Sequence, residues 1–208
     1  MISILRLRPL APPALVTLIA LFPCAALAQT ATQPAPGKTP VLVELFTSEG
    51  CSSCPPADAL LGRLEREQPV KNADIIVLEE HVDYWEKDGW HDRFSSSAYT
   101  ERQNQYRPPL KFDEGYTPQM VVDGSVQFVG NDPQKALTSI TEAAQSPKVV
   151  LSLQRIGKLQ DLGSGPLKFT LKTPADNIAP ESLRVVVFAQ SPGQGPVRGA
   201  ASIPTTKQ

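Results

Sequence analysis

The sequence contains few of the residues that mark the commonest kinds of functional site. Its 208 residues include three cysteines, two histidines, two tryptophans and two methionines. A zinc or copper(I) site usually has three or four histidine or cysteine ligands. Because the chain has two histidines, such a site would have to use cysteine as well. The 21 acidic and 20 basic residues nearly balance, at a net charge of −1, and no basic patch indicates binding to nucleic acid or to an anionic membrane surface.

Long apolar runs are also absent beyond the beginning of the chain. Residues 1–28 carry Arg6 and Arg8 before an apolar core and end in a small-residue cleavage pattern. The core is too short, and too interrupted by prolines, for a comfortable transmembrane helix. Cys24 follows Pro23 rather than a small residue, which argues against a lipid anchor. We therefore expect a cleaved signal peptide, a periplasmic or secreted protein and no stable membrane anchor.

Removal of this signal peptide leaves two cysteines, Cys51 and Cys54, in a Cys-x-x-Cys motif. It also removes two basic residues and no acidic one, so the net charge becomes −3. In an exported protein such a pair forms either a stabilising disulfide or a redox couple. The short spacing favours the redox couple, because so small a loop restricts the unfolded chain little.

The motif lies at a predicted junction between a strand and a helix. The apolar run at residues 41–46 is rich in β-branched residues and predicts a buried strand. Apolar residues at helical spacing between positions 57 and 64 predict an amphipathic helix over about residues 52–68. Pro55 and Pro56 fit the first turn of that helix.

The start of a helix favours an anion, because its N–H groups are unpaired and the helix dipole is positive there. Cysteines at such positions have pKa values of about 3.5–7.5 and are nucleophilic near neutral pH. Glu49 opposes ionisation, so we expect only moderate stabilisation of the thiolate. We expect Cys51 to be the exposed, attacking sulfur, and Cys54 to point inward and resolve the mixed disulfide.

The following segments predict the rest of an α/β domain. Residues 75–78 predict a second buried strand parallel to the first. Residues 119–122 and 125–129 predict a hairpin closed by an Asp-Gly turn, and a helix is expected from about residue 133 to 144.

Residues 82–116 are expected to form an inserted, partly helical segment rich in aromatic side chains. The insert leaves the second strand at its carboxyl end, where reactive groups lie on such sheets and where Cys51 also falls. It is either a lid packed on the sheet or a platform for a ligand. Trp85 and Trp90 are the residues of the insert that we expect to line a substrate groove.

The order strand, Cys51-x-x-Cys54, helix, strand, Thr117-Pro118, strand, hairpin and helix resembles the thioredoxin fold. The resemblance implies a mixed sheet flanked by helices, with a cis proline at Pro118 beside the cysteines and the backbone of Thr117 offered to a bound peptide. It also matches Glu44 to a buried acidic residue that shuttles the proton of Cys54. A solvated glutamate at a sheet edge is the alternative for Glu44.

A narrower resemblance covers residues 41–145. It is carried by residues 46–58, Val82-Asp83-Tyr84-Trp85, Gly89-Trp90, Arg102-Gln103 and Tyr116-Thr117-Pro118-Gln119. These segments resemble a family of exported bacterial proteins called domain of unknown function 1223. Membership implies a thioredoxin-like domain with a small antiparallel β-rich extension, and it implies no particular substrate.

The expected layout is a signal peptide (1–28), a flexible leader (29–39), a thioredoxin-like domain (40–146), a β-rich extension (147–189) and a disordered tail (190–208). In the extension, β-prone runs at residues 149–153, 167–171 and 183–188 predict three strands. From Gln190 the chain is rich in proline and glycine and shows no sign of the further strand that the family implies.

The leading functional hypothesis is an exported thiol–disulfide oxidoreductase that exchanges disulfides with a partner protein and uses no cofactor. In this hypothesis Cys51 attacks, Cys54 resolves and Pro118 shapes the substrate groove. Reductase, oxidase and isomerase differ in reduction potential, which the spacing of the cysteines does not fix.

Two alternatives remain open. In one, Cys51, Cys54 and His81 bind copper(I) or zinc, since soft thiolates select such metals. A proline in the position of Pro118 argues against this, because it tends to exclude metal from the cysteine pair. In the other, the protein is a non-catalytic binding module with a structural disulfide and an aromatic contact surface.

Overall fold

The structure, a computed structural model, describes residues 37–88, 91–151 and 184–204. The elements in chain order are β1 (Thr39–Thr47), α1 (Pro55–Glu67), β2 (Ala73–His81), the 3-10 helix η1 (Asp83–Asp88), α2 (Ser97–Gln105), α3 (Arg107–Leu110), β3 (Gln119–Val122), β4 (Val126–Val129), α4 (Pro133–Ala143), β5 (Arg184–Gln190) and β6 (Val197–Pro204). Among these ranges, no helix has the length and apolar character needed to cross a membrane. The predicted signal peptide at residues 1–28 lies outside the described residues.

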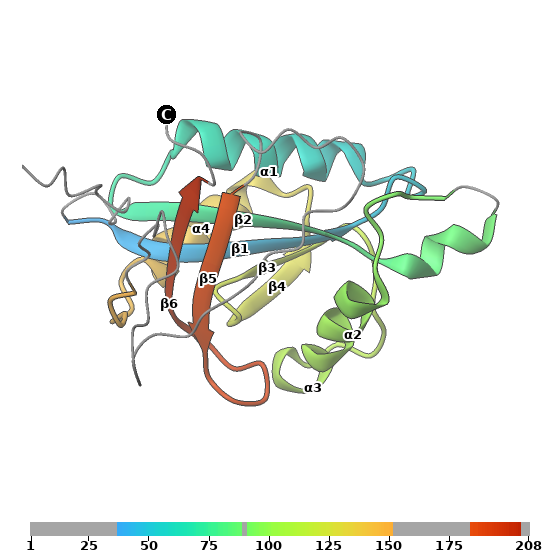
Figure 1. Ribbon diagram of the computed structural model, residues 1–208. Coiled ribbons are helices and arrows are strands. Elements are labelled where there is room, and N and C mark those ends of the chain that lie inside the picture. Colours follow the sequence, from blue (N-terminus) through green and yellow to red (C-terminus); the bar gives the residue numbers. More distant parts are fainter. Residues whose placement is uncertain (1–36, 89–90, 152–183, 205–208) are drawn as a thin grey trace, which may run out of the picture.

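The strands form a mixed four-stranded sheet in the order β2-β1-β3-β4 and a separate two-stranded antiparallel sheet of β5 and β6 (Figure 1). β1 is parallel to β2 and antiparallel to β3, and β3 continues into β4 as a hairpin. The predicted fold class is therefore confirmed: an α/β domain with a mixed sheet flanked by helices and a small antiparallel C-terminal sheet. The helices η1, α2 and α3 lie within the predicted insert.

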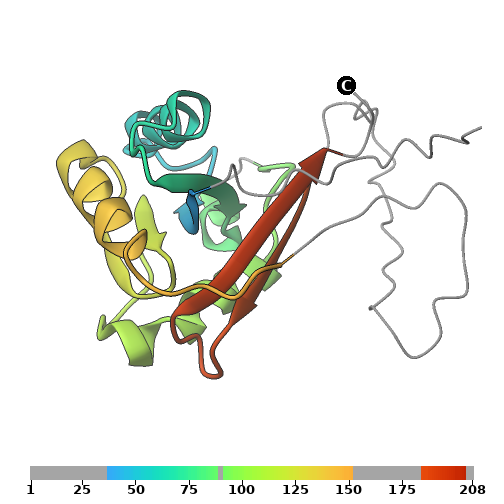
Figure 2. The same ribbon diagram turned by 90° about the vertical axis from the view of Figure 1, so that its left-hand side faces the viewer.

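The central strand β1 is covered on both faces, which explains its continuous apolar sequence. Val41, Val43 and Leu45 point toward α1 and α4, with which they form one buried cluster. Leu42 and Phe46 point the other way, toward the β5–β6 hairpin and the helical insert respectively. Figure 2 shows α1 and α4 on one side of the sheet and the hairpin on the other.

The expectation of a disordered tail from residue 190 is wrong as far as residue 204. β6 pairs with β5 along its length and buries Val197 and Ala200 against Leu42 and Ile76 of the main sheet. The sequence does not predict this strand because most of its inward residues are small, and glycine and alanine have low strand propensity. Burial against the sheet, rather than local preference, fixes this strand.

The other predicted strands of the extension have different outcomes. The run at residues 183–188 corresponds to β5. Residues 149–151 lie outside any strand, although the Val149 N–H donates to the Arg198 carbonyl of β6 at 2.6 Å. The run at residues 167–171 lies outside the described residues.

Candidate functional site

Cys51 and Cys54 form a disulfide just beyond the carboxyl end of β1, with their Cα atoms 5.4 Å apart. Cys54 is the N-cap residue of α1, and its N–H donates to the Cys51 carbonyl at 3.1 Å. Pro55 and Pro56 occupy the first two helical positions. The predicted junction is thus correct, although the helix begins at Pro55, after the cysteine loop rather than within it.

Both sulfur-bearing residues are buried in the disulfide form. Cys51 is 2% exposed and Cys54 is fully buried, whereas the two serines between them are exposed. The expectation that Cys51 is the exposed sulfur is therefore wrong. The insert returns over the loop: a Cβ atom on Gly50 would come within 3.3 Å of the Trp85 Cβ. Position in the sequence could not show this, because Trp85 is far from the motif along the chain.

The Thr117–Pro118 segment and the start of α1 both lie close to Gly130, and the implied contact of Pro118 with the cysteines stays a prediction. The Thr117–Pro118 peptide bond is cis, and the next residue, Gln119, pairs with Phe46 near the end of β1. The Pro118 carbonyl accepts the Gly130 N–H at 2.9 Å. A Cβ on Gly130 would lie 3.3 Å from the Ala57 Cβ and 3.4 Å from the Pro118 Cβ. Pro118 and the first turn of α1 therefore both lie close to Gly130.

Trp85 connects the two loops that flank the disulfide. Its Nε1 donates to Thr117 Oγ1 at 2.8 Å, while its Cβ lies beside Gly50. The structure therefore brings Trp85, Thr117 and Pro118 to the cysteine end of the sheet. Trp90, the other tryptophan expected in the groove, lies outside the described residues. We refer to Cys51, Cys54, Trp85, Thr117 and Pro118 as the disulfide site.

The start of α1 offers fewer hydrogen-bond donors than the sequence suggested. A helix usually leaves its first N–H groups unpaired, but Pro55 and Pro56 have no N–H to offer. The Ala57 and Asp58 N–H groups both donate to the Cys54 carbonyl, at 2.8 and 3.1 Å. A thiolate here would therefore depend on the helix dipole and on side chains rather than on free backbone donors.

Two side chains near the start of α1 would act on such a thiolate in opposite directions. The Ser53 hydroxyl lies 3.5 Å from Cys51 Sγ and can donate to it. Asp58 adds a negative charge to the first turn of α1. Burial raises the pKa of Asp58, and the hydrogen bond from Thr47 Oγ1 at 2.7 Å offsets part of this rise.

Glu44 does not lie beneath the cysteines. It alternates with Val43 and Leu45 along β1 and so points away from α1, toward the insert. There it accepts hydrogen bonds from Arg102 Nε and from the Tyr106 hydroxyl, both at 2.6 Å. Its proposed role as a proton shuttle for Cys54 is wrong. The alternative of a solvated edge glutamate is wrong as well, because Glu44 is fully buried on a central strand.

The Glu44 side chain instead belongs to a buried ionic cluster with Glu80, Arg102 and Tyr106. Arg102 lies 3.4 Å from Glu80 and receives further contacts from Gln190 of the C-terminal hairpin. Burial, and then the nearby charge of Glu44, raises the pKa of Glu80 to about 8. Burial also raises the pKa of Glu44, against the opposing effect of Arg102. The sequence contains a signal for this cluster: Glu44 lies within an apolar strand, and a buried acidic residue needs a buried partner.

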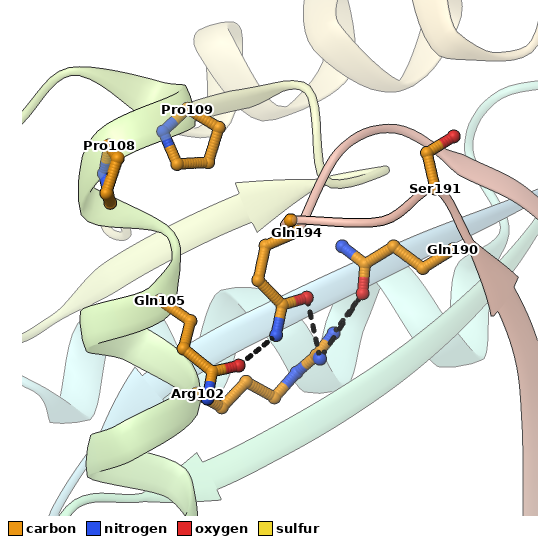
Figure 3. A pocket seen from close by; sticks show the side chains of 8 residues that line it. Arg102, Gln105, Pro108, Pro109, Gln190, Ser191 and Gln194 are labelled. Carbon is orange, nitrogen blue, oxygen red and sulfur yellow. Dashed lines mark hydrogen bonds between the residues drawn. The ribbon is translucent and has the colours of Figure 1, made fainter.

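A cavity of about 620 Å³ opens beside Arg102, and neither cysteine lines it (Figure 3). Its lining residues are Arg102, Gln105, Pro108, Pro109, Gln190, Ser191, Gly193 and Gln194. Arg102 is already paired with Glu44 and also donates to the Gln190 and Gln194 amide oxygens at 3.3 Å. We therefore place the candidate chemistry at the disulfide site rather than in this cavity.

His81, the candidate third metal ligand, is paired with a residue that the sequence did not single out. Its Nδ1 lies 2.7 Å from Asp92 Oδ2. Burial alone would raise the pKa of Asp92, but hydrogen bonds from His81 and from the Glu49 and Phe94 N–H groups lower it. Across the described ranges, no three Cys, His, Asp or Glu side chains are grouped to hold a metal ion. Asp92 lies in a loop, so no periodic pattern marks it.

Comparisons with known proteins place the chain in a family. A search of curated proteins finds no match. A crystal structure of a protein from Agrobacterium tumefaciens is 37% identical over 52% of this chain and 46% of that protein, with a TM-score of 0.47, so the match spans less than half of that protein's length. The family described as "Protein of unknown function (DUF1223)" matches residues 42–188, most of the chain. The chain therefore belongs to this family.

Proposed function

We propose that this protein is an exported thiol–disulfide oxidoreductase that exchanges disulfides with a partner protein through Cys51 and Cys54. The observation that supports this best is the position of the disulfide. It lies at the β1–α1 junction, and Gly130 lies close both to the first turn of that helix and to Pro118. The signal-like sequence of residues 1–28 supports a periplasmic or secreted location.

The exchange needs only the two cysteines. In the reduced protein the Cys51 thiolate attacks a disulfide of the partner, and one partner sulfur leaves as a thiolate that takes a proton from solvent. The Cys54 thiolate then attacks Cys51 Sγ, which re-forms the Cys51–Cys54 bond and releases the second partner thiol. Two electrons pass from the protein to the partner, and the reverse sequence oxidises a partner dithiol. No cofactor is required.

Access to Cys51 is the step that the surrounding side chains would control. Because Cys51 is buried in the disulfide form, a partner reaches its sulfur only when the neighbouring side chains move. Trp85 is joined to both flanking loops, by packing at Gly50 and by its hydrogen bond to Thr117. We expect partner binding to displace Trp85 from this bridging position.

The surroundings of the cysteines favour a reducing rather than a strongly oxidising protein. Strong oxidants of this kind stabilise the reduced form through a thiolate of low pKa. Here Pro55 and Pro56 remove backbone donors, and Asp58 adds a negative charge to the same turn. We expect a reduction potential nearer to about −270 mV, the value of thioredoxin, than to about −120 mV.

A second candidate function is a binding module in which the disulfide is purely structural. The burial of both cysteines favours it, since structural disulfides resist reduction and are inaccessible to thiols. In that case the aromatic insert would be the contact surface for a partner.

Trapping of mixed disulfides distinguishes the two functions. The Cys54→Ser variant cannot resolve its adducts, so it should accumulate complexes with exported proteins that dithiothreitol releases. The matched Cys51→Ser variant lacks the attacking sulfur and should form none. If neither variant forms adducts and the wild-type potential lies below about −300 mV, the disulfide is structural and the oxidoreductase proposal is wrong.

A further inference from the structure

A buried carboxylate holds the turn that precedes Cys51. Asp92 is 1% exposed, and its Oδ2 accepts the Glu49 N–H at 2.8 Å and contacts the Ser48 hydroxyl at 3.3 Å. Its other oxygen, Oδ1, accepts the Phe94 N–H at 2.9 Å. One side chain of the insert thus binds two successive residues of the cysteine loop across more than 40 positions of sequence.

Ser48 transmits this constraint to the disulfide. The Cys51 N–H donates to the Ser48 carbonyl at 3.0 Å, and the Gly50 N–H donates to the Ser48 hydroxyl at 3.1 Å. Fixing Ser48 therefore fixes the backbone on which Cys51 is placed. The two serines beyond Cys51 are exposed.

His81 in turn orients Asp92. A carboxylate accepts hydrogen bonds, so the 2.7 Å contact between His81 Nδ1 and Asp92 Oδ2 requires the proton on Nδ1. The imidazole is held by its position at the end of β2 and by the Phe94 ring, 5.4 Å away between centroids. The charged residues Asp58 of α1 and Glu79 of β2 also interact electrostatically with His81.

We propose that His81 and Asp92 are positioning residues for disulfide exchange. His81 orients the Asp92 carboxylate, and Asp92 holds the turn at residues 48–50 so that Cys51 is kept next to Cys54. This inference rests on the proposed function and adds the residues that set the stability of the Cys51–Cys54 bond. Neither residue touches a sulfur atom, so both act through the conformation of the turn.

We expect loss of the His81–Asp92 contact to lower the effective concentration of the Cys51 thiol at Cys54. Pre-organisation of two reacting groups favours their intramolecular reaction. If the turn loosens, Cys51 spends less time next to Cys54, and the disulfide becomes easier to reduce. The loss of about one hydrogen bond corresponds to a roughly three- to tenfold change in an equilibrium constant.

The test compares His81→Ala, His81→Asn and Gln68→Ala in the full mature chain. Asparagine keeps an N–H donor near the position of Nδ1, whereas alanine does not. Gln68 makes hydrogen bonds to Glu65 and Ile75 at the opposite end of α1, so its removal costs similar contacts far from the cysteines. Each protein is equilibrated with reduced and oxidised glutathione, and its thermal midpoint is measured in parallel.

We expect His81→Ala to lower the equilibrium constant for disulfide formation about three- to tenfold, and His81→Asn to restore it to about the wild-type value. Gln68→Ala should lower the thermal midpoint and leave that constant unchanged. A His81→Ala protein with the wild-type constant would overturn the inference and make the pair merely structural. A wild-type protein that does not exchange with glutathione would instead overturn the proposed function, so the two failures are distinguishable.

Discussion

Trp85 donates a hydrogen bond from its indole Nε1 to Thr117 Oγ1 at 2.8 Å, and so joins the insert to the residue that precedes Pro118. Its Cβ also lies against Gly50, immediately before Cys51. The two segments that a partner would have to approach are therefore linked by one side chain. The disulfide, just beyond the carboxyl end of β1, is buried in the same region.

Replacement of Trp85 should expose the disulfide. We expect Trp85→Ala to increase the rate of reduction by dithiothreitol about tenfold, because the side chain that spans the two loops is removed while the cysteines stay in place. Trp85→Phe is the matched comparison, since it keeps a ring beside Gly50 but loses the N–H donor to Thr117, and it should react at a rate between those of the wild type and Trp85→Ala. Stopped-flow measurement of reduction checks both, and an unchanged rate for Trp85→Ala would exclude a gating role.

The charge of Asp58 should lower the reduction potential. Asp58 opposes a thiolate in the first turn of α1, so Asp58→Asn should stabilise the reduced form and raise the potential. We expect a two- to fivefold shift in the equilibrium with glutathione, as is typical of a partly exposed charge at this range. Asp74→Asn, at the amino end of β2, is the control and should have no effect. A shift toward the disulfide in Asp58→Asn would contradict the electrostatic argument.

Ser53 should assist the nucleophile. Its hydroxyl lies 3.5 Å from Cys51 Sγ and can donate to the thiolate of the reduced protein. Ser53→Ala should therefore slow alkylation of Cys51 by iodoacetamide at pH 7 about two- to fivefold. Ser52→Ala removes a neighbouring exposed hydroxyl and should leave the rate unchanged. Equal rates in the two variants would show that the hydroxyl contributes nothing.

Glu80 should make the fold less stable as the pH rises. Its pKa is about 8 in the folded protein against 4.5 for an ordinary glutamate, so between these values the unfolded chain binds fewer protons than the native one. The free energy of unfolding should then fall from about pH 4.5 to pH 8. Glu80→Gln removes this dependence and should stabilise the protein by about 1–3 kcal/mol at pH 8.

Urea unfolding at pH 5 and pH 8 tests this effect. The control is Glu67→Gln, which alters an exposed side chain at the end of α1. The difference in stability between the two pH values should shrink in Glu80→Gln and persist in the control. An unchanged difference in Glu80→Gln would show that Glu80 is ionised in the folded protein at neutral pH.

The features that sequence patterns predicted correctly are local ones. The β1–α1 junction follows from an apolar run, two prolines and helical spacing between positions 57 and 64. The turn at Asp123 follows from its Asp-Gly pair, and Asp123 does adopt a positive φ of 57°. In each case neighbouring residues determine the backbone conformation, so a short window of sequence contains the information.

The features that the sequence did not reveal depend on distant contacts. Both faces of β1 are buried, so alternation does not show which face α1 covers, and Glu44 lies on the face opposite to the predicted one. Its true partner, Arg102, is 58 residues away. Asp92 reaches the cysteine loop from a segment without regular structure, and β6 is specified by burial of small side chains. None of these relationships leaves a periodic signal.

The most direct test of the central claim is the reaction of the folded, oxidised protein with glutathione, followed by mass spectrometry under conditions that keep the fold intact. Our account predicts a glutathione adduct on Cys51, its resolution by Cys54, and a reduction potential near that of thioredoxin, about −270 mV. A disulfide that stays intact until the protein is unfolded would contradict the account.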